Sequence, residues 1–142
     1  MFRLLVPVDG SETSSRAVDN LLKKLNWYKA DKVEIHLLNV QHSLHGDVAM
    51  FVNAEQIKQF HHDEGLKALA SARAKLDAAK VPYIFHIGVG DPAHVIVHYA
   101  HEKKCEQIFM GSRGLGSIAG LLLGSVTIKV IHLSDVPILL VK

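Results

Sequence analysis

The chain has 142 residues, 49% of them hydrophobic and 21% charged, and its formal net charge at pH 7 is +2. A chain of this length and composition fits one globular domain that folds without a disulfide or a metal. No run of Lys or Arg is longer than two residues, which argues against the basic stripe of a nucleic-acid-binding protein.

The single cysteine and the short apolar runs indicate a soluble protein of a reducing compartment. Cys105 has no second cysteine to pair with, and we interpret it as a small core residue rather than a redox centre. The apolar run at residues 4–8 is too short for a signal peptide, and no stretch approaches the ~20 apolar residues of a membrane span. We therefore expect a cytoplasmic protein with no membrane partner.

Apolar, β-branched runs alternate with helical patterns along the chain. A strand is predicted at residues 2–8, then a helix that Ser11 caps, and then a second strand at residues 33–40. Residues 41–52 lack periodicity and are predicted to form a loop. A long helix follows at residues 53–80, and the apolar residues of one of its faces are Ala68, Leu69, Ala72, Leu76 and Ala79.

The second half of the chain continues this alternation. A third strand is predicted at residues 82–89. Asp91 followed by Pro92 then marks the start of a helix whose inward stripe consists of Ala93, Ile96, Val97 and Ala100. The last three predicted elements are a strand, a helix and a strand, at residues 107–110, 124–133 and 136–141.

This order of elements predicts an α/β fold, with one doubly wound domain over residues 1–142 and a five-stranded parallel sheet covered by helices on both faces. Ligands of such sheets bind outside the carboxyl ends of the strands, where the strand order reverses. Asp9, Val40, Gly90 and the loop that begins at Gly111 lie at those ends. For Asp9 two roles stay open: contact with a ligand, or capping of the turn before the first helix.

The most informative segment is glycine-rich and connects the fourth strand to the last helix. Five glycines occur within fourteen residues, and glycine lets a ligand approach the main chain closely. Gly124 and Ser125 stand at a helix start, where unpaired N–H groups favour an anion such as phosphate, and Arg113 adds a positive charge. The alternative is a tight loop whose glycines only satisfy turn geometry. The segment lacks the Gly-Lys-Ser/Thr ending of a P-loop.

The spacing Gly111-x2-Gly114-x9-Gly124-Ser125 resembles the nucleotide signature of the ATP-binding branch of the universal stress protein family. The opening strand with Asp9 and the closing strand also resemble that family, so the resemblance covers the whole chain. It implies a flavodoxin-like, Rossmann-like sheet in the order 3-2-1-4-5. It also implies a homodimer through the last strand, from Val136 to Val141.

The resemblance implies an ATP site as well, with Mg²⁺ or Mn²⁺ as the accompanying cation. Residues implied to border the adenine and the ribose are Pro7, Val8, Asp9 and, through its backbone, Val40. Those implied to hold the ribose and the first phosphate are Met110, Gly111, Arg113 and Gly114. Those implied to hold the outer phosphates are Gly124, Ser125 and Val126. One departure from the family pattern is that residues 117–123 carry no basic side chain, which implies a lower affinity for phosphate.

The ten histidines do not suggest a catalytic centre. His94, His98 and His101 share one helix face, which we interpret as solvated rather than as a metal site. The pair His61 and His62 is expected on a helix surface, and the pair His42 and His45 in the loop between the second strand and the long helix. No set of nucleophile, base and orienting residue is evident. The sequence therefore predicts an ATP-binding regulatory module of the stress response, with a slow ATP hydrolase or a ligand-free structural dimer as the alternatives.

Overall fold

Five parallel strands form one sheet in the computed structural model, which describes residues 1–44, 46, 50–115, 120 and 122–142. Their order across the sheet is β3-β2-β1-β4-β5, and each neighbouring pair is parallel. The predicted α/β fold and strand order are thereby confirmed. The strands are β1 Phe2–Pro7, β2 Val33–Gln41, β3 Ile84–Val89, β4 Gln107–Gly111 and β5 Ile138–Val141.

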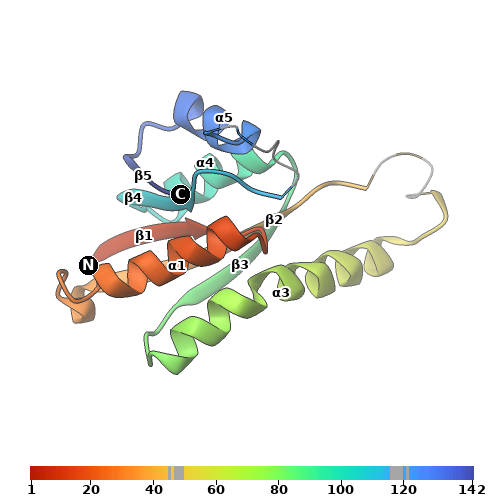
Figure 1. Cartoon of the computed structure of the whole chain (residues 1–142). Coiled ribbons are helices and arrows are strands. Elements are labelled where there is room, and N and C mark those ends of the chain that lie inside the picture. The colour runs from red at the N-terminus through yellow and green to blue at the C-terminus, as the bar shows by residue number, and fades with distance from the viewer. Residues whose placement is uncertain (45, 47–49, 116–119, 121) are drawn as a thin grey trace.

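Helices cover both faces of the sheet (Figure 1). On one face lie α1 and α3, and on the other lie α4 and α5. Right-handed crossovers between parallel strands produce this arrangement when the chain changes direction across the sheet at β1. The helices are α1 Glu12–Lys24, α3 Ala54–Ala78, α4 Pro92–Glu102 and α5 Ser125–Leu133, with a short 3₁₀ helix, η1, at Ala30–Lys32.

Each face of the sheet has its own hydrophobic core, and the central strand β1 contributes to both. Leu4 and Val6 are buried beneath α1 and α3, whereas Leu5 is buried beneath α4 and α5. Since successive side chains of a strand point to opposite faces, a strand covered on both sides needs an uninterrupted apolar sequence. The run Leu4-Leu5-Val6 meets that requirement, which is why β1 can occupy the centre.

The helix starts follow from local side-chain chemistry, as the sequence predicted for Ser11 and Asp91. The Ser11 hydroxyl accepts a hydrogen bond from the Ser14 backbone N–H at 3.2 Å, and the Asp91 carboxylate accepts one from the His94 N–H, also at 3.2 Å. Asn53 forms a reciprocal capping box with Gln56 at the start of α3. Each cap satisfies donors that the first helical turn leaves unpaired.

Several predicted boundaries and surfaces are corrected by the structure. The third and fifth strands begin two residues later than predicted, at Ile84 and Ile138. Ala79, predicted on the apolar face of α3, is the exposed C-cap of that helix. His61, predicted on the surface, is buried at 5% exposure. Within α3 the buried face is instead His61, Gly65, Leu69, Ala72 and Leu76.

Two predicted loops are only partly described. In the first, residues 41–52, Gln41 belongs to β2, and Gly46 and Met50 are helical, which the lack of periodicity did not predict. Residues 45 and 47–49 of that loop lie outside the described part of the chain. In the second loop, residues 111–123, residues 116–119 and 121 lie outside the described part of the chain.

Cys105 is buried, as expected of a core residue, and burial raises the pKa of its thiol to about 11. A thiol with so high a pKa is protonated at neutral pH and is a poor nucleophile. Among the described residues, no helix combines the length and the apolar composition needed to cross a bilayer.

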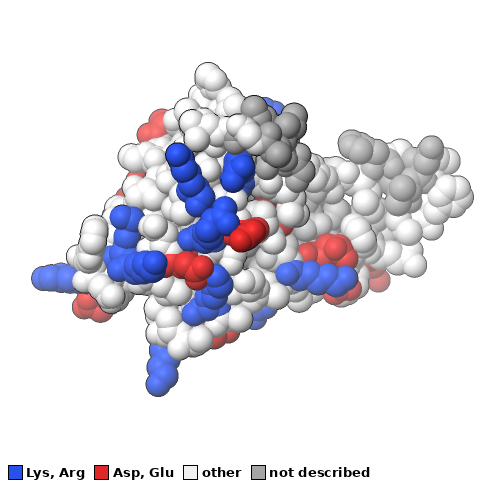
Figure 2. Space-filling model, in the orientation of Figure 1, with Lys and Arg blue, Asp and Glu red and all other residues white. Residues whose placement is uncertain are grey.

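Basic and acidic side chains alternate over the face formed by α1 and α3, as Figure 2 shows. Lys75 bridges the two helices there: its ammonium group lies 2.8 Å from the Asp19 carboxylate of α1 and donates to the Ser15 hydroxyl at 2.8 Å. Arg16 pairs with Glu12 at 3.2 Å one helical turn away. These pairs balance the charges of this face locally.

Candidate functional site

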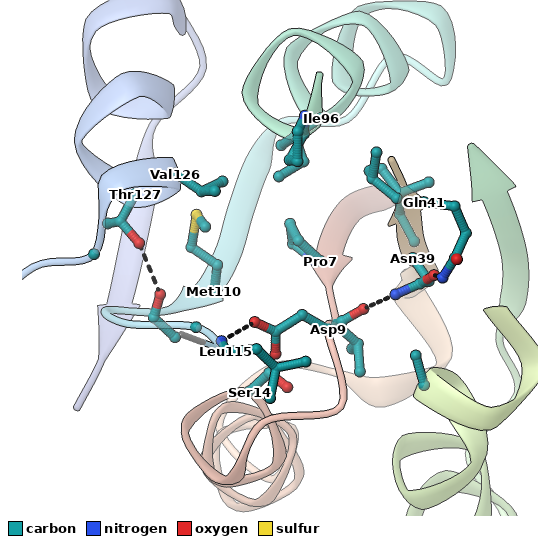
Figure 3. Close-up of a pocket in the computed structure, with 18 of the residues that line it drawn as sticks. Pro7, Asp9, Ser14, Asn39, Gln41, Ile96, Met110, Leu115, Val126 and Thr127 are labelled. Carbon is teal, nitrogen blue, oxygen red and sulfur yellow. Dashed lines mark hydrogen bonds between the residues drawn. The ribbon is translucent and has the colours of Figure 1, made fainter. Parts of the chain in front are cut away.

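A cavity of about 530 Å³ opens at the carboxyl edge of the sheet, beside the ends of β1, β2 and β4 (Figure 3). The starts of α4 and α5 complete its wall through Ile96 and Val126. All eleven residues that the resemblance implied line this one cavity: Pro7, Val8, Asp9, Val40, Met110, Gly111, Arg113, Gly114, Gly124, Ser125 and Val126. Strand ends that are separated by more than 100 residues in the sequence are therefore neighbours here.

Asp9 links the end of β1 to the loop that follows β4. Its Oδ1 atom accepts a hydrogen bond from the Ser11 backbone N–H, and its Oδ2 atom accepts one from the Leu115 N–H, both at 2.9 Å. Figure 3 shows the carboxylate directed toward Leu115. The capping role that the sequence left open for Asp9 is thus present. A carboxylate has about four acceptor positions, so two bonds leave room for contact with a ligand.

Gly114 is required by the close approach of this carboxylate. A Cβ atom at residue 114 would collide with the Asp9 Oδ2 atom. Glycine therefore lets the main chain of the loop pass directly over Asp9, where its neighbour Leu115 donates the hydrogen bond. This contact fixes the first part of the glycine-rich loop against the turn after β1.

The N-terminus of α5 closes the other side of the same loop. The Gly124 backbone N–H donates to the Ser112 carbonyl at 2.8 Å, and a Cβ atom at residue 124 would lie 3.2 Å from the Arg113 Cα atom. Gly124 is the N-cap, and it has no side chain with which to cap this helix. The first N–H groups of α5 and the positive end of its dipole therefore remain available beside the cavity, and both favour an anion.

A chain of polar groups borders the cavity at the end of β2. The Asn39 side chain is only 3% exposed, and its amide nitrogen donates to the Val8 carbonyl at 2.8 Å. Its oxygen accepts from the Gln41 side chain at 2.7 Å (Figure 3). The Gly90 N–H donates to the Gln41 carbonyl at 2.9 Å, which joins this edge to the turn after β3. The ends of β1, β2 and β3 are thus held in register around the cavity.

Sequence reasoning missed part of the lining. Three residues of α3, Glu64, Lys67 and Ala68, reach the cavity because the helix crosses over the end of β2, which no local pattern reveals. Asn39 could have been found, since a polar residue inside an apolar strand is a recognisable signal. Together with Asn39, the other lining residues that the sequence did not predict are Ser14, Leu38, Gln41, His42, Pro92, Ile96, Leu115 and Thr127.

Two acidic side chains, Asp9 and Glu64, and two basic ones, Lys67 and Arg113, are the charged groups among the described residues that line the cavity. Lys67 pairs with Glu64 at 3.1 Å, in an exposed pair of the same helix, and Arg113 pairs with no carboxylate of the described residues. Next to Pro92, hydrogen bonds from His94 and Lys129 lower the pKa of Asp91 to about 2. Its carboxylate is therefore ionised at neutral pH and is engaged by those two neighbours.

The three histidines on α4 each face a different carboxylate. His94 lies 2.6 Å from Asp91, His98 lies 3.3 Å from Glu102, and His101 lies 3.0 Å from Asp135. Among the described residues, no group of three or more His, Cys, Asp or Glu side chains is placed to hold a metal ion.

Comparison with known proteins places this chain in one family. A model of the universal stress protein family matches residues 1–142. The universal stress protein YxiE of Bacillus subtilis is 33% identical over 150 residues, which is 99% of this chain and 98% of that protein. The solved structure of MJ0577 from Methanocaldococcus jannaschii is 27% identical, with a TM-score of 0.76, over 99% of this chain and 95% of that one.

A crystal structure of a universal stress protein in complex with cAMP is also 27% identical, with a TM-score of 0.72, over 99% of this chain and 97% of that one. The match of the family model along the whole chain, together with YxiE and with the shared fold, establishes the family. This chain is a stress-response protein of the universal stress protein family.

Proposed function

We propose that this protein is a nucleotide-binding regulatory module that holds ATP in the cavity at the carboxyl edge of its sheet. The observation that carries the proposal is the N-terminus of α5, whose N-cap residue Gly124 has no capping side chain and which is folded against the loop at Gly114 and lines the cavity. Such a helix terminus favours phosphate. The cAMP complex of a relative of similar length supports a nucleotide as the ligand.

In this proposal the base lies against Pro7 and Val8, and the Val40 backbone supplies its hydrogen bonds. The Asp9 carboxylate accepts a hydrogen bond from a ribose hydroxyl, using lone pairs that its bonds from Ser11 and Leu115 leave free. The ribose and the first phosphate contact residues of the loop after β4, and the outer phosphates contact the start of α5. The ribose and first-phosphate residues are Met110, Gly111, Arg113 and Gly114, and the outer-phosphate residues are Gly124, Ser125 and Val126.

The negative charge of the phosphates must be balanced by positive charge, and the glycine-rich loop supplies only that of Arg113. Residues 117–123 have no basic side chain. We infer that Lys67 contributes from α3, because it lines the cavity and its pair with Glu64 is exposed and therefore weak. A divalent cation such as Mg²⁺ or Mn²⁺, bound together with the nucleotide, would supply the remaining positive charge.

A Gly124→Asp variant tests the phosphate assignment. Aspartate is a good N-cap residue and Gly124 has the extended backbone of one, so α5 is retained once the Arg113 main chain, 3.2 Å from the added Cβ atom, moves slightly, while the new carboxylate repels phosphate. We expect ATP affinity, measured by calorimetry with Mg²⁺, to fall by more than about a hundredfold. Circular dichroism checks that the variant is folded.

An Ala70→Asp variant is the matched control, since it adds the same charge on the exposed face of α3 and should leave the affinity unchanged. Unchanged ATP binding by Gly124→Asp would refute the phosphate assignment. The same titration with AMP, cyclic AMP and GTP defines the preferred nucleotide. Turnover of ATP faster than about one per minute would instead favour the hydrolase alternative.

We also propose a homodimer through β5. This strand is at the edge of the sheet, its side chains are half-buried, and Ile128 and Ile131 of α5 are 45% and 43% exposed. An apolar edge strand pairs readily with a second chain. Light scattering should give twice the monomer mass at micromolar concentration, and a Leu139→Lys variant should give the monomer. A monomeric unmodified protein contradicts the proposal.

A further inference from the structure

A second cavity, of about 480 Å³, lies at the other side of the sheet's carboxyl edge, between the first half of α3 and the edge strand β3. Its walls are the α3 residues Ala54, Ile57, Lys58, His61 and His62, together with Ser43, Leu44, Ile87 and Val89. None of these residues lines the cavity assigned to the nucleotide.

The lining of this second cavity combines aliphatic side chains with basic ones. Leu44, Ile57, Ile87 and Val89 make most of its surface apolar. Among the described residues that line it there is no Asp or Glu, and Lys58 forms no salt bridge with a carboxylate of that part of the chain. A cavity with these properties is complementary to a molecule that has an apolar body and a single negative charge.

His61 lies in the wall of this cavity and contributes an almost fully buried polar side chain. Four residues further along α3, a Cβ atom at Gly65 would lie 2.7 Å from the Ile87 side chain, so the helix packs tightly on β3 there. In the preceding turn His61 is buried to 5% exposure, and its Nδ1 atom has no hydrogen-bond partner among the described residues. A buried polar atom without a partner is costly in a native protein.

The burial of Nδ1 also determines what the ring offers to a ligand. A proton on Nδ1 would leave a buried N–H group unpaired, which is less favourable than an unpaired lone pair. In the neutral ring the proton therefore resides on Nε2, and His61 acts as a donor. Since 58, 61 and 62 are spaced by three and four residues, Lys58, His61 and His62 share one face of α3 and lie on the same wall of the cavity.

We propose that this second cavity binds a small amphipathic monocarboxylate, such as a medium-chain fatty acid in its free form. The aliphatic tail packs against Ile57, Ile87 and Val89. The carboxylate is held by the Lys58 ammonium group and by the His61 donor, with the Ser43 hydroxyl as a further donor at the rim. This site is separate from the nucleotide site and does not depend on it.

Octanoate titrated into ¹⁵N-labelled protein tests the proposal. It should shift the amide signals of residues 57–62 and the imidazole signals of His61 in a saturable way. With about ten non-hydrogen atoms, octanoate should bind with a dissociation constant of about 0.1–1 mM. Octan-1-ol has the same tail without the charge and should bind at least about fivefold more weakly.

Two variants locate the charge recognition. Lys58→Met keeps the apolar stem, so octanoate affinity should fall about fivefold while the affinity for octan-1-ol stays unchanged. His61→Phe fills the same volume without a donor and should also weaken octanoate. Circular dichroism checks the fold of both, and Lys58→Met, at an exposed position, decides the outcome if His61→Phe does not fold.

Lys32→Met, at an exposed position of η1, is the control for a general loss of positive charge and should leave octanoate binding unchanged. Three results would overturn the proposal. The first is the absence of saturable shifts at about 10 mM octanoate, well above the expected dissociation constant. The second is equal affinity for octan-1-ol. The third is an equal effect of Lys32→Met and Lys58→Met.

Discussion

At the scale of single residues, the site depends on where a side chain is missing. The Asp9 carboxylate lies against the main chain at Gly114 and accepts a hydrogen bond from the Leu115 N–H. This one contact holds the start of the loop in place. The sequence revealed both partners, Asp9 from its place at a strand end and Gly114 from its spacing. It did not reveal that they contact each other, because that contact joins segments more than 100 residues apart.

A Gly114→Ala variant tests this contact. The added methyl group displaces the Asp9 carboxylate and breaks its bond to Leu115, so we expect the free energy of unfolding to fall by about 1–3 kcal/mol. Urea denaturation monitored by circular dichroism measures it. In an Asp9→Ala background the same substitution should cost much less, because the group that it displaces is absent. An equal cost in both backgrounds would show that the contact is not the cause.

At the scale of elements, a line of polar side chains joins three strands beneath α4. His36 of β2 is buried at 4% exposure, with its Nε2 atom 2.6 Å from the Glu34 carboxylate and its Nδ1 atom 2.9 Å from the His86 Nε2 atom of β3. Glu34 in turn pairs with Arg3 of β1 at 3.3 Å. The sequence could not predict this line, because the side chains meet only when the register of β1, β2 and β3 is known.

This line makes stability depend on pH. Burial, followed by the nearby charges of His36 and Lys103, lowers the pKa of His86 below its usual 6.5, and the hydrogen bond from His36 lowers the pKa of Glu34 below 4.5. Both folded pKa values lie below the unfolded ones. The His86 contribution is therefore complete above pH 6.5 and is lost as the pH falls toward the folded pKa, and that of Glu34 is lost below pH 4.5.

Urea denaturation between pH 7.5 and pH 5 measures the histidine part of this effect. The free energy of unfolding should decrease over that range, and a His86→Gln variant, whose amide can either donate to or accept from His36, should show a shallower decrease. His132→Gln, at an exposed position of α5, serves as the control and should follow the unmodified protein. Identical slopes for His86→Gln and the unmodified protein would contradict this account.

At the scale of the whole molecule, the sequence predicted the architecture better than the surfaces. The alternation of elements indicated a parallel sheet, and the family resemblance implied its order, because strand ends and glycine spacing are local patterns. The burial of His61 was not predictable, since it follows from the tight packing of Gly65 on Ile87. Nor were Glu64 and Lys67, which reach the first cavity because of where α3 crosses the sheet.

The described residues that line the first cavity come from six stretches of the chain, within residues 7–14, 38–42, 64–68, 92–96, 110–115 and 124–127. A molecule bound there would contact both halves of the sequence, so the unfolding of either half would release it. Its binding free energy would then add to the cooperativity of the entire protein rather than to one loop. The resistance of the folded chain to proteolysis would therefore increase with the concentration of the ligand in the cell.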